Sequence, residues 1–174
     1  MTKLSKALIA SVLFHFALLL SFAAMAADWK ISKREGAVDL SITGNITNGE
    51  RQRFVFRKGK CDQVIHAFST YTEEPANFDK VVGKIFTIQF NGEEIGAKLG
   101  GAHKAMMGHL LYFNLGGYGK DTLLSHLKKD PKITIKFVDG DGYKASEYFD
   151  VPSNEWSIDG ISAAFGNAYK ACSQ

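Results

Sequence analysis

The chain has little of several features that would point to a mechanism. Its 174 residues include two cysteines and three prolines, and 21 basic against 18 acidic side chains leave a net charge of +3. This small excess gives no reason to expect nucleic acid as a partner. The sequence also lacks a Gly-x-Ser-x-Gly motif, a phosphate-binding glycine loop and a His-Glu-x-x-His motif. The common hydrolase, nucleotide-binding and zinc-protease signatures are therefore missing.

The N-terminus has the pattern of a Sec-type signal peptide. Lys3 and Lys6 form a basic N-terminal region, and an apolar run covers residues 7–22. Ala24-Met25-Ala26 then places small residues just before the expected cleavage site. The run is nearly long enough for a membrane anchor, which is the competing interpretation. We expect cleavage after Ala26, and no second long apolar run follows. The sequence thus predicts a periplasmic or secreted protein without a stable membrane span after cleavage.

If the protein is exported, its two cysteines are expected to form a disulfide. In an oxidising compartment Cys61 and Cys172 are expected to pair with each other. The loop that they close would be about 110 residues long, which on the chain-entropy model stabilises the fold by up to about 4–5 kcal/mol. The alternative is a free, reactive Cys61, which would need histidine and asparagine neighbours that the sequence does not clearly supply.

Most of the remaining chain shows the alternating apolar and polar residues of half-buried strands. Asn48-Gly49 and Asn91-Gly92 are typical of tight hairpin turns. Short helices are expected at residues 121–129 and after Asp159, which stands in an N-cap position. The expected strands are residues 29–31, 38–42, 53–58, 64–72, 85–90, 95–99, 110–115, 133–137 and 143–149.

This pattern predicts a mainly β protein, an antiparallel β-sandwich with two short helices formed by residues 27–174 as one domain. The final helix has one apolar stripe, which should lie on the sheet and bring Cys172 against it. The stripe comprises Ile161, Ala164, Phe165, Ala168 and Cys172.

Candidate catalytic and metal residues are few. Glu73 or Glu74 with His66 is the only acid–base pairing that the sequence suggests, and nothing in their spacing brings them together. His66, His103 and His109 do not have the spacing of metal ligands on a helix or a strand. The run 139–142 begins like a calcium loop, but Tyr143 and Lys144 follow where the motif needs an oxygen ligand and glycine. We therefore predict no catalytic residue, no metal and no cofactor.

The glycine-rich segment 100–119 is the least explained part of the sequence. One interpretation, which the periodicity favours, is a core strand flanked by loops. The other is an apolar lip that a partner covers. The candidate interaction surface comprises Met106, Met107, Leu111, Tyr112 and Tyr118.

The C-terminal part of the chain resembles a known family. A short helix at residues 122–129, the strand Ile133-Thr134-Ile135-Lys136-Phe137, and the run Trp156 to Phe165 precede the late Cys172. This order resembles the invasion-associated locus B proteins of Gram-negative bacteria, with Gly160, Ala163 and Ala164 matching the helix start. Early cysteines near Trp29, which the family often carries, are missing here. The resemblance implies an exported β-sandwich with an envelope role and no enzymatic activity.

The sequence as a whole predicts an exported binding protein whose partner is an envelope or host protein. Two other functions stay open. One is a periplasmic inhibitor or immunity-type protein that inserts an exposed loop into an enzyme, and the other is a small hydrolase using Glu73 or Glu74 with His66.

Overall fold

A computed structural model describes residues 28–44 and 50–174 of the chain. The predicted signal peptide and the Asn48-Gly49 turn lie outside the described residues. The strands are β1 (Lys30–Arg34), β2 (Ala37–Thr43), β3 (Arg51–Arg57), β4 (Lys60–Thr72), β5 (Ile85–Phe90), β6 (Glu93–Ala105), β7 (Gly108–Gly119), β8 (Lys132–Phe137) and β9 (Ser153–Ser157). The helical elements are η2 (Phe78–Lys80), α2 (Lys120–Leu127), η3 (Ala145–Glu147) and α3 (Ile161–Ser173).

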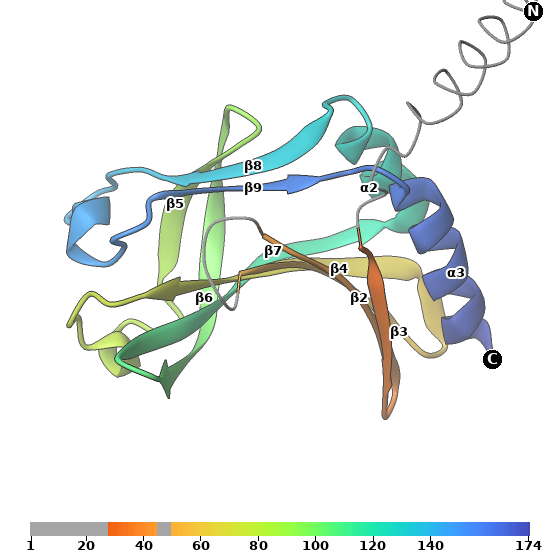
Figure 1. Ribbon diagram of the computed structural model, residues 1–174, viewed down its shortest axis with the longest axis horizontal. Helices are drawn as coiled ribbons and strands as arrows, with labels where there is room; N and C mark the ends of the chain where they lie inside the picture. Colours follow the sequence, from red (N-terminus) through yellow and green to blue (C-terminus); the bar gives the residue numbers. More distant parts are fainter. Residues whose placement is uncertain (1–27, 45–49) are drawn as a thin grey trace, which may run out of the picture.

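All these strands join one antiparallel sheet in the order β1-β2-β3-β4-β7-β6-β5-β8-β9. The sheet curls around its core (Figure 1). In that view β8 and β9 run along one side and β2, β3, β4 and β7 along the other. β5 and β6 connect the two sides at one end, and α2 and α3 stand at the opposite end.

The prediction of a mainly β, antiparallel fold with two helices is confirmed. The sandwich of two separate sheets is not what forms, because one continuous sheet covers both sides of the core. Two register shifts show how the long strands bend: one in the β4–β7 pairing between His66 and Ala67, and one in the β6–β7 pairing between Leu99 and Gly101. An irregularity of this kind bends a strand and increases its twist.

The two ends of the curled sheet meet through side chains rather than through a strand ladder. Asn154 of β9 donates from Nδ2 to Oε1 of Glu50, just before β3, at 2.7 Å. Trp29 donates from Nε1 to the carbonyl oxygen of Asp159 at 2.8 Å. Trp156 of β9 is fully buried. These contacts hold the β9 side against the β1–β3 side and enclose the core between them.

Aromatic rings fill the centre of the core. Phe113 of β7 lies parallel to Phe68 of β4 with ring centroids 4.9 Å apart, and it also contacts Phe137 of β8 at 5.2 Å. Phe137 stacks on Phe149 at 3.6 Å. Phe113 therefore joins strands that are far apart in the order of the sheet.

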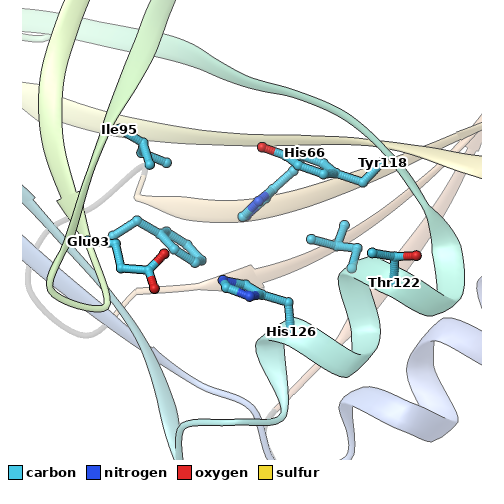
Figure 2. Close-up of a pocket in the computed structure, with 8 residues that line it drawn as sticks. His66, Glu93, Ile95, Tyr118, Thr122 and His126 are labelled. Atoms are coloured by element: carbon cyan, nitrogen blue, oxygen red, sulfur yellow. The ribbon is translucent and has the colours of Figure 1, made fainter.

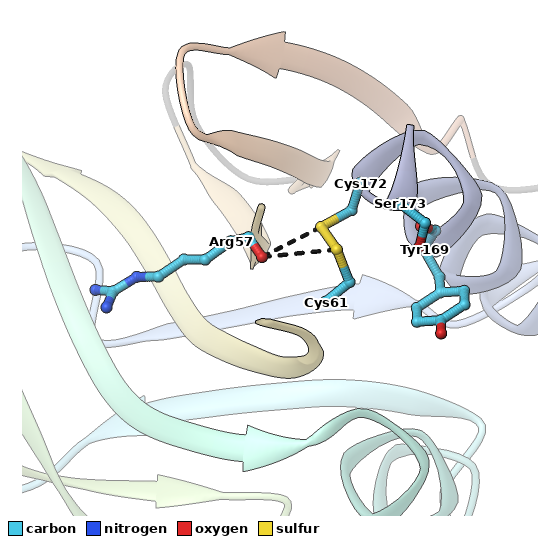
Figure 3. The surroundings of a disulfide bond; sticks show 5 residues. All are labelled: Arg57, Cys61, Tyr169, Cys172 and Ser173. Atoms are coloured by element: carbon cyan, nitrogen blue, oxygen red, sulfur yellow. Dashed lines mark hydrogen bonds between the residues drawn. A yellow bond between two sulfur atoms is a disulfide. The ribbon is translucent and has the colours of Figure 1, made fainter. Parts of the chain in front are cut away.

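Helix α3 packs on the sheet with the predicted stripe inward. Phe165 contacts Phe54 and Phe56 of β3 at ring-centroid distances of 4.9 and 5.6 Å. A disulfide joins Cys172 to Cys61, with Cα atoms 5.9 Å apart, so the predicted pairing is present (Figure 3). Both sulfur atoms lie within 3.6 Å of the Arg57 carbonyl oxygen. The N-cap is Gly160, at φ +73°, and not Asp159, whose carboxylate accepts a hydrogen bond from Ser157.

Two predictions about the extent of the strands were also wrong. Residues 143–149 do not form a strand; they form a turn and η3, and β8 pairs with β9 instead. The aromatic residues there favour packing on the core over pairing, since Tyr143 and Phe149 contact Phe86 at 5.1 and 5.4 Å. Residues 100–109 are not a loop, because β6 and β7 extend through them as far as a turn at Met106 and Met107.

Candidate functional site

A pocket opens beside α2, at the end of the curled sheet that the helices cover (Figure 2). Its volume is about 280 Å³. Side chains from β4, β5, β6, β7 and α2 line it, so nearly every central strand contributes. We call it the α2 pocket, defined by His66, Phe90, Glu93, Ile95, Tyr118, Thr122, Leu123 and His126.

The interior of the α2 pocket is apolar and aromatic. Phe90 and Leu123 are buried core residues, and Ile95 is half-buried beside them. The His126 ring lies nearly parallel to Phe90, with centroids 6.1 Å apart and an interplanar angle of 18°. A ligand inside would therefore meet flat ring surfaces and aliphatic groups, which favour an apolar body.

His66 lies at the inner end of the α2 pocket. It is 2% exposed and stacks on Phe54 at 4.9 Å. Its Nε2 lies 3.0 Å from Oε1 of Gln52, so with the amide in this orientation Nε2 carries the hydrogen and donates it. Burial, together with the nearby His126, lowers the pKa of His66 to about 3. His66 is therefore a neutral imidazole whose one N–H is already used.

Polar groups lie around the outer part of the pocket. The Glu93 carboxylate and the His126 imidazole both extend into the space beside His66 (Figure 2). Glu93 is exposed, and among the described residues it is the one pocket-lining side chain that carries a formal charge when the histidines are neutral. The Tyr118 hydroxyl donates to the carbonyl oxygen of Leu115 at 2.7 Å, so its hydrogen is committed. The pocket thus combines an apolar interior with a carboxylate near its mouth.

The buried state of His66 predicts a specific dependence of stability on pH. The unfolded chain takes up a proton at this residue near pH 6.5, whereas the folded protein does so only near pH 3. Between these values the unfolded state binds more protons, so the free energy of unfolding falls as the pH is lowered. The limiting slope from this residue is about 1.4 kcal/mol per pH unit. Urea unfolding at pH 6 and pH 4 measures the loss.

The variant His66→Gln removes the titrating group. From pH 6 to pH 4 we expect the wild type to lose about 2 kcal/mol more than this variant. The matched control is His103→Gln, at an exposed position, which should keep the wild-type slope. Equal slopes for the wild type and His66→Gln would show that His66 does not resist protonation in the folded protein.

The acid–base pairing of the hydrolase hypothesis does not assemble. Glu73 and Glu74 follow the end of β4, seven and eight positions after His66. An extended strand separates residues that far apart by roughly 20 Å. The Glu73 backbone N–H donates to Asp150 at 3.1 Å, away from the α2 pocket. The structure therefore keeps these carboxyl groups apart from His66.

The three histidines that were weighed as metal ligands are also separated. His66 lies in the α2 pocket, His103 packs edge-on against Tyr112 at 5.5 Å, and His109 contacts Phe78 at 4.9 Å. In residues 28–44 and 50–174 no group of three or more His, Cys, Asp or Glu side chains is arranged to hold a metal ion.

The candidate interaction surface is divided by the fold. Met106 and Met107 form the turn between β6 and β7 and are 87% and 83% exposed. Leu111 is fully buried in the core, and Tyr112 is half-buried on the opposite face of β7. Tyr118 lies eleven residues from Met107 along β7, roughly 35 Å for an extended strand, and lines the α2 pocket. One predicted surface therefore becomes an exposed methionine tip and a separate pocket residue.

Sequence reasoning missed most of the α2 pocket. It singled out His66 and Tyr118, but it gave Glu93 and His126 no role. One signal was available: the Asn91-Gly92 turn places Phe90 directly opposite Glu93. The strand register therefore places an apolar side chain next to a carboxylate. It does not show that helix α2 covers both of them.

A second hollow of about 300 Å³ lies at the β3, β4 and β7 strands near the disulfide. Arg57, Lys60 and Gln63 line it together with Asn114 and the Gly116-Gly117 backbone. Val64 and Ile65 supply its apolar side chains, and among the described residues no aromatic ring lines it. It is therefore less suited than the α2 pocket to holding an organic ligand.

The fold and pocket define a class: a mainly β protein with one curled antiparallel sheet, a disulfide-linked C-terminal helix and a small-molecule-sized pocket. No helix in the part of the chain that the structure describes is long and apolar enough to span a bilayer. Comparison of the chain with family models, curated proteins and solved structures finds no match.

Proposed function

We propose that this is an exported binding protein that holds a small organic ligand in the α2 pocket and does so without catalysis. The observation that carries the proposal is the pocket itself, about 280 Å³ with an apolar aromatic interior and a few polar groups at fixed positions. Small-molecule sites have this composition, although most are somewhat larger. The ligand is therefore small.

Two observations favour binding over catalysis. His66, the deepest polar group, is neutral because burial and His126 lower its pKa to about 3, and its N–H is donated to Gln52. It is thus a poor proton donor or acceptor near neutral pH. Glu73 and Glu74, the carboxylates of the hydrolase hypothesis, are outside the pocket lining.

Export is supported by the disulfide, since structural disulfides persist in oxidising compartments. A periplasmic location agrees with the signal-peptide pattern and with the resemblance to the invasion-associated locus B proteins. On this proposal the protein acts in the envelope of a Gram-negative cell.

Pocket occupancy is tested with three probes that share a phenyl ring and differ in head group: 2-phenylethylamine, 2-phenylethanol and 3-phenylpropanoate. Titration calorimetry on the purified exported protein should show binding of at least one probe. The variant Ile95→Trp places a large ring in the pocket and should abolish that binding. Unchanged thermal unfolding of the variant confirms that it is folded.

Two results would contradict the proposal. One is that the wild type binds none of the three probes, or that Ile95→Trp binds them equally well. The other is turnover: hydrolysis of phenyl acetate that depends on Glu93 or His126 would show that the site is catalytic.

A second candidate function, the inhibitor-type protein, is favoured by the β6–β7 turn. Met106 and Met107 are largely exposed there, and flexible methionine side chains suit an interaction surface. β5 pairs with β6 only as far as Lys98. Leu99 still forms backbone hydrogen bonds with Gly83 and Lys84. In the described part of the chain, the remaining six residues of β6, 100–105, have β7 on one side and no strand on the other.

For this second function we expect the double variant Met106→Ser/Met107→Ser to lose inhibition of the envelope enzyme that the wild type inhibits. Its thermal unfolding should stay within about 1 °C of the wild type, since exposed positions contribute little to stability. The control is Ile85→Ser, which removes another exposed apolar side chain, 63% exposed, away from the turn. Inhibition that survives the double variant would exclude the methionine tip.

A further inference from the structure

The charge distribution around the α2 pocket limits which ligand it accepts. Glu93 supplies a carboxylate, and among the residues that the structure describes no lysine or arginine lines the pocket. Lys120, at the start of α2, is paired with Asp121 and lies over the Tyr169 ring at 5.1 Å. An anionic ligand would therefore meet a like charge without a compensating cation, whereas a cation would meet an opposite one.

The rings of the pocket add to this preference. Phe90, Tyr118 and the two histidines surround the space, and the His66 ring lies edge-on to Phe90 at 5.4 Å and to Tyr118 at 6.4 Å. The faces of Phe90 and Tyr118 carry partial negative charge and attract cations. His66 is neutral and therefore does not repel a cation.

The depth of each pocket-lining side chain determines how a bound ligand would be oriented. Phe90 and Leu123 are buried, whereas Glu93 and Tyr118 are exposed near the mouth. A ligand with an apolar body and one charged end can insert the body and keep its charge at the rim, partly hydrated. Full burial of the charge, which would be costly, is avoided.

We propose that the α2 pocket binds a small organic amine in its protonated form, with an aromatic or branched apolar body inside and the ammonium group at the Glu93 carboxylate. This inference rests on the proposed function and names its ligand class. A partly exposed ion pair and a cation–π contact together predict a preference of about tenfold for the amine over the matched alcohol. The matched carboxylate should bind weakest.

The test compares 2-phenylethylamine, 2-phenylethanol and 3-phenylpropanoate at pH 7.5 by calorimetry. The wild type should prefer the amine by about tenfold, and Glu93→Gln should bring amine and alcohol within about threefold of each other. The control is Glu94→Gln, the next residue of β6, whose side chain alternates to the other face of the strand and is not in the pocket lining. It should keep the full preference.

The outcomes separate the two proposals. If the three probes bind equally well and Ile95→Trp abolishes all of them, the amine class is overturned and the binding function stands. If Glu93→Gln keeps the preference, the role of Glu93 is overturned. If the wild type binds no probe, the proposed binding function itself fails. An amine preference that falls in Glu93→Gln alone supports the inference.

Discussion

Removal of the Cys61–Cys172 disulfide is expected to lower the free energy of unfolding by about 4 kcal/mol. The two cysteines are 111 positions apart, and cross-linking so long a loop strongly restricts the unfolded chain. The disulfide also holds the last turn of α3, where Cys172 is buried beside β4 and the Arg57 carbonyl. Denaturant unfolding of the variant Cys61→Ala/Cys172→Ala measures the loss.

Reducing agent provides the control. It should lower the stability of the wild type to that of the alanine variant and leave the variant unchanged, because the variant has no other cysteine. Mass spectrometry without reduction should find the two cysteines in one linked peptide. A loss below about 1 kcal/mol would show that the chain-entropy effect is not realised in this fold.

The second large effect concerns Phe113, at the centre of the core. Phe113→Ala should lower the free energy of unfolding by about 3–5 kcal/mol, the usual cost of removing a buried phenyl ring. The ring is 1% exposed and contacts Phe68 and Phe137, which belong to opposite sides of the curled sheet. Its removal leaves a cavity that both sides would have to close.

Tyr112→Ala is the matched control, because the neighbouring residue of β7 faces the other side of the strand. Tyr112 is half-buried and lies near Arg53 and His103. We expect it to cost less than half as much as Phe113→Ala. If both substitutions cost the same, the interior of the curled sheet would not be where the structure places it.

Much of the local structure could be predicted from the sequence because short-range patterns decide it. Alternating residues identified β2, β3, β5 and β8, and Asn91-Gly92 identified the β5–β6 hairpin. Both turn residues have positive φ, 47° and 87°, as a type I′ turn requires. The apolar stripe of α3 likewise predicted its buried face.

Long-range features were harder to predict. Glycines concealed that β6 and β7 continue through residues 100–109, because glycine has weak strand preference yet is tolerated where a strand bends. Because β6 and β7 continue through these residues and bend at the register shift between Leu99 and Gly101, one continuous sheet forms instead of the two expected sheets. Aromatic residues after β8 resembled a strand, but their packing on Phe86 took precedence over pairing.

The α2 pocket depends on the same long-range features. Its lining comes from five elements, and no short motif unites them. His66 is deep only because β3 and β4 place it over Phe54, and Glu93 reaches the mouth only because the hairpin turn ends there. The resemblance to the invasion-associated locus B proteins stays a prediction about the envelope role, and it does not name this pocket.

The most direct test of the account is to locate a bound amine on the protein. Two-dimensional amide NMR of the purified protein, titrated with 2-phenylethylamine, reports which residues sense the ligand. We predict saturable shifts in β4 around His66, in β7 near Tyr118 and along α2, with the Met106–Met107 turn unchanged. Saturable shifts confined to that turn, or no shifts at millimolar amine, would contradict the α2 pocket as the binding site.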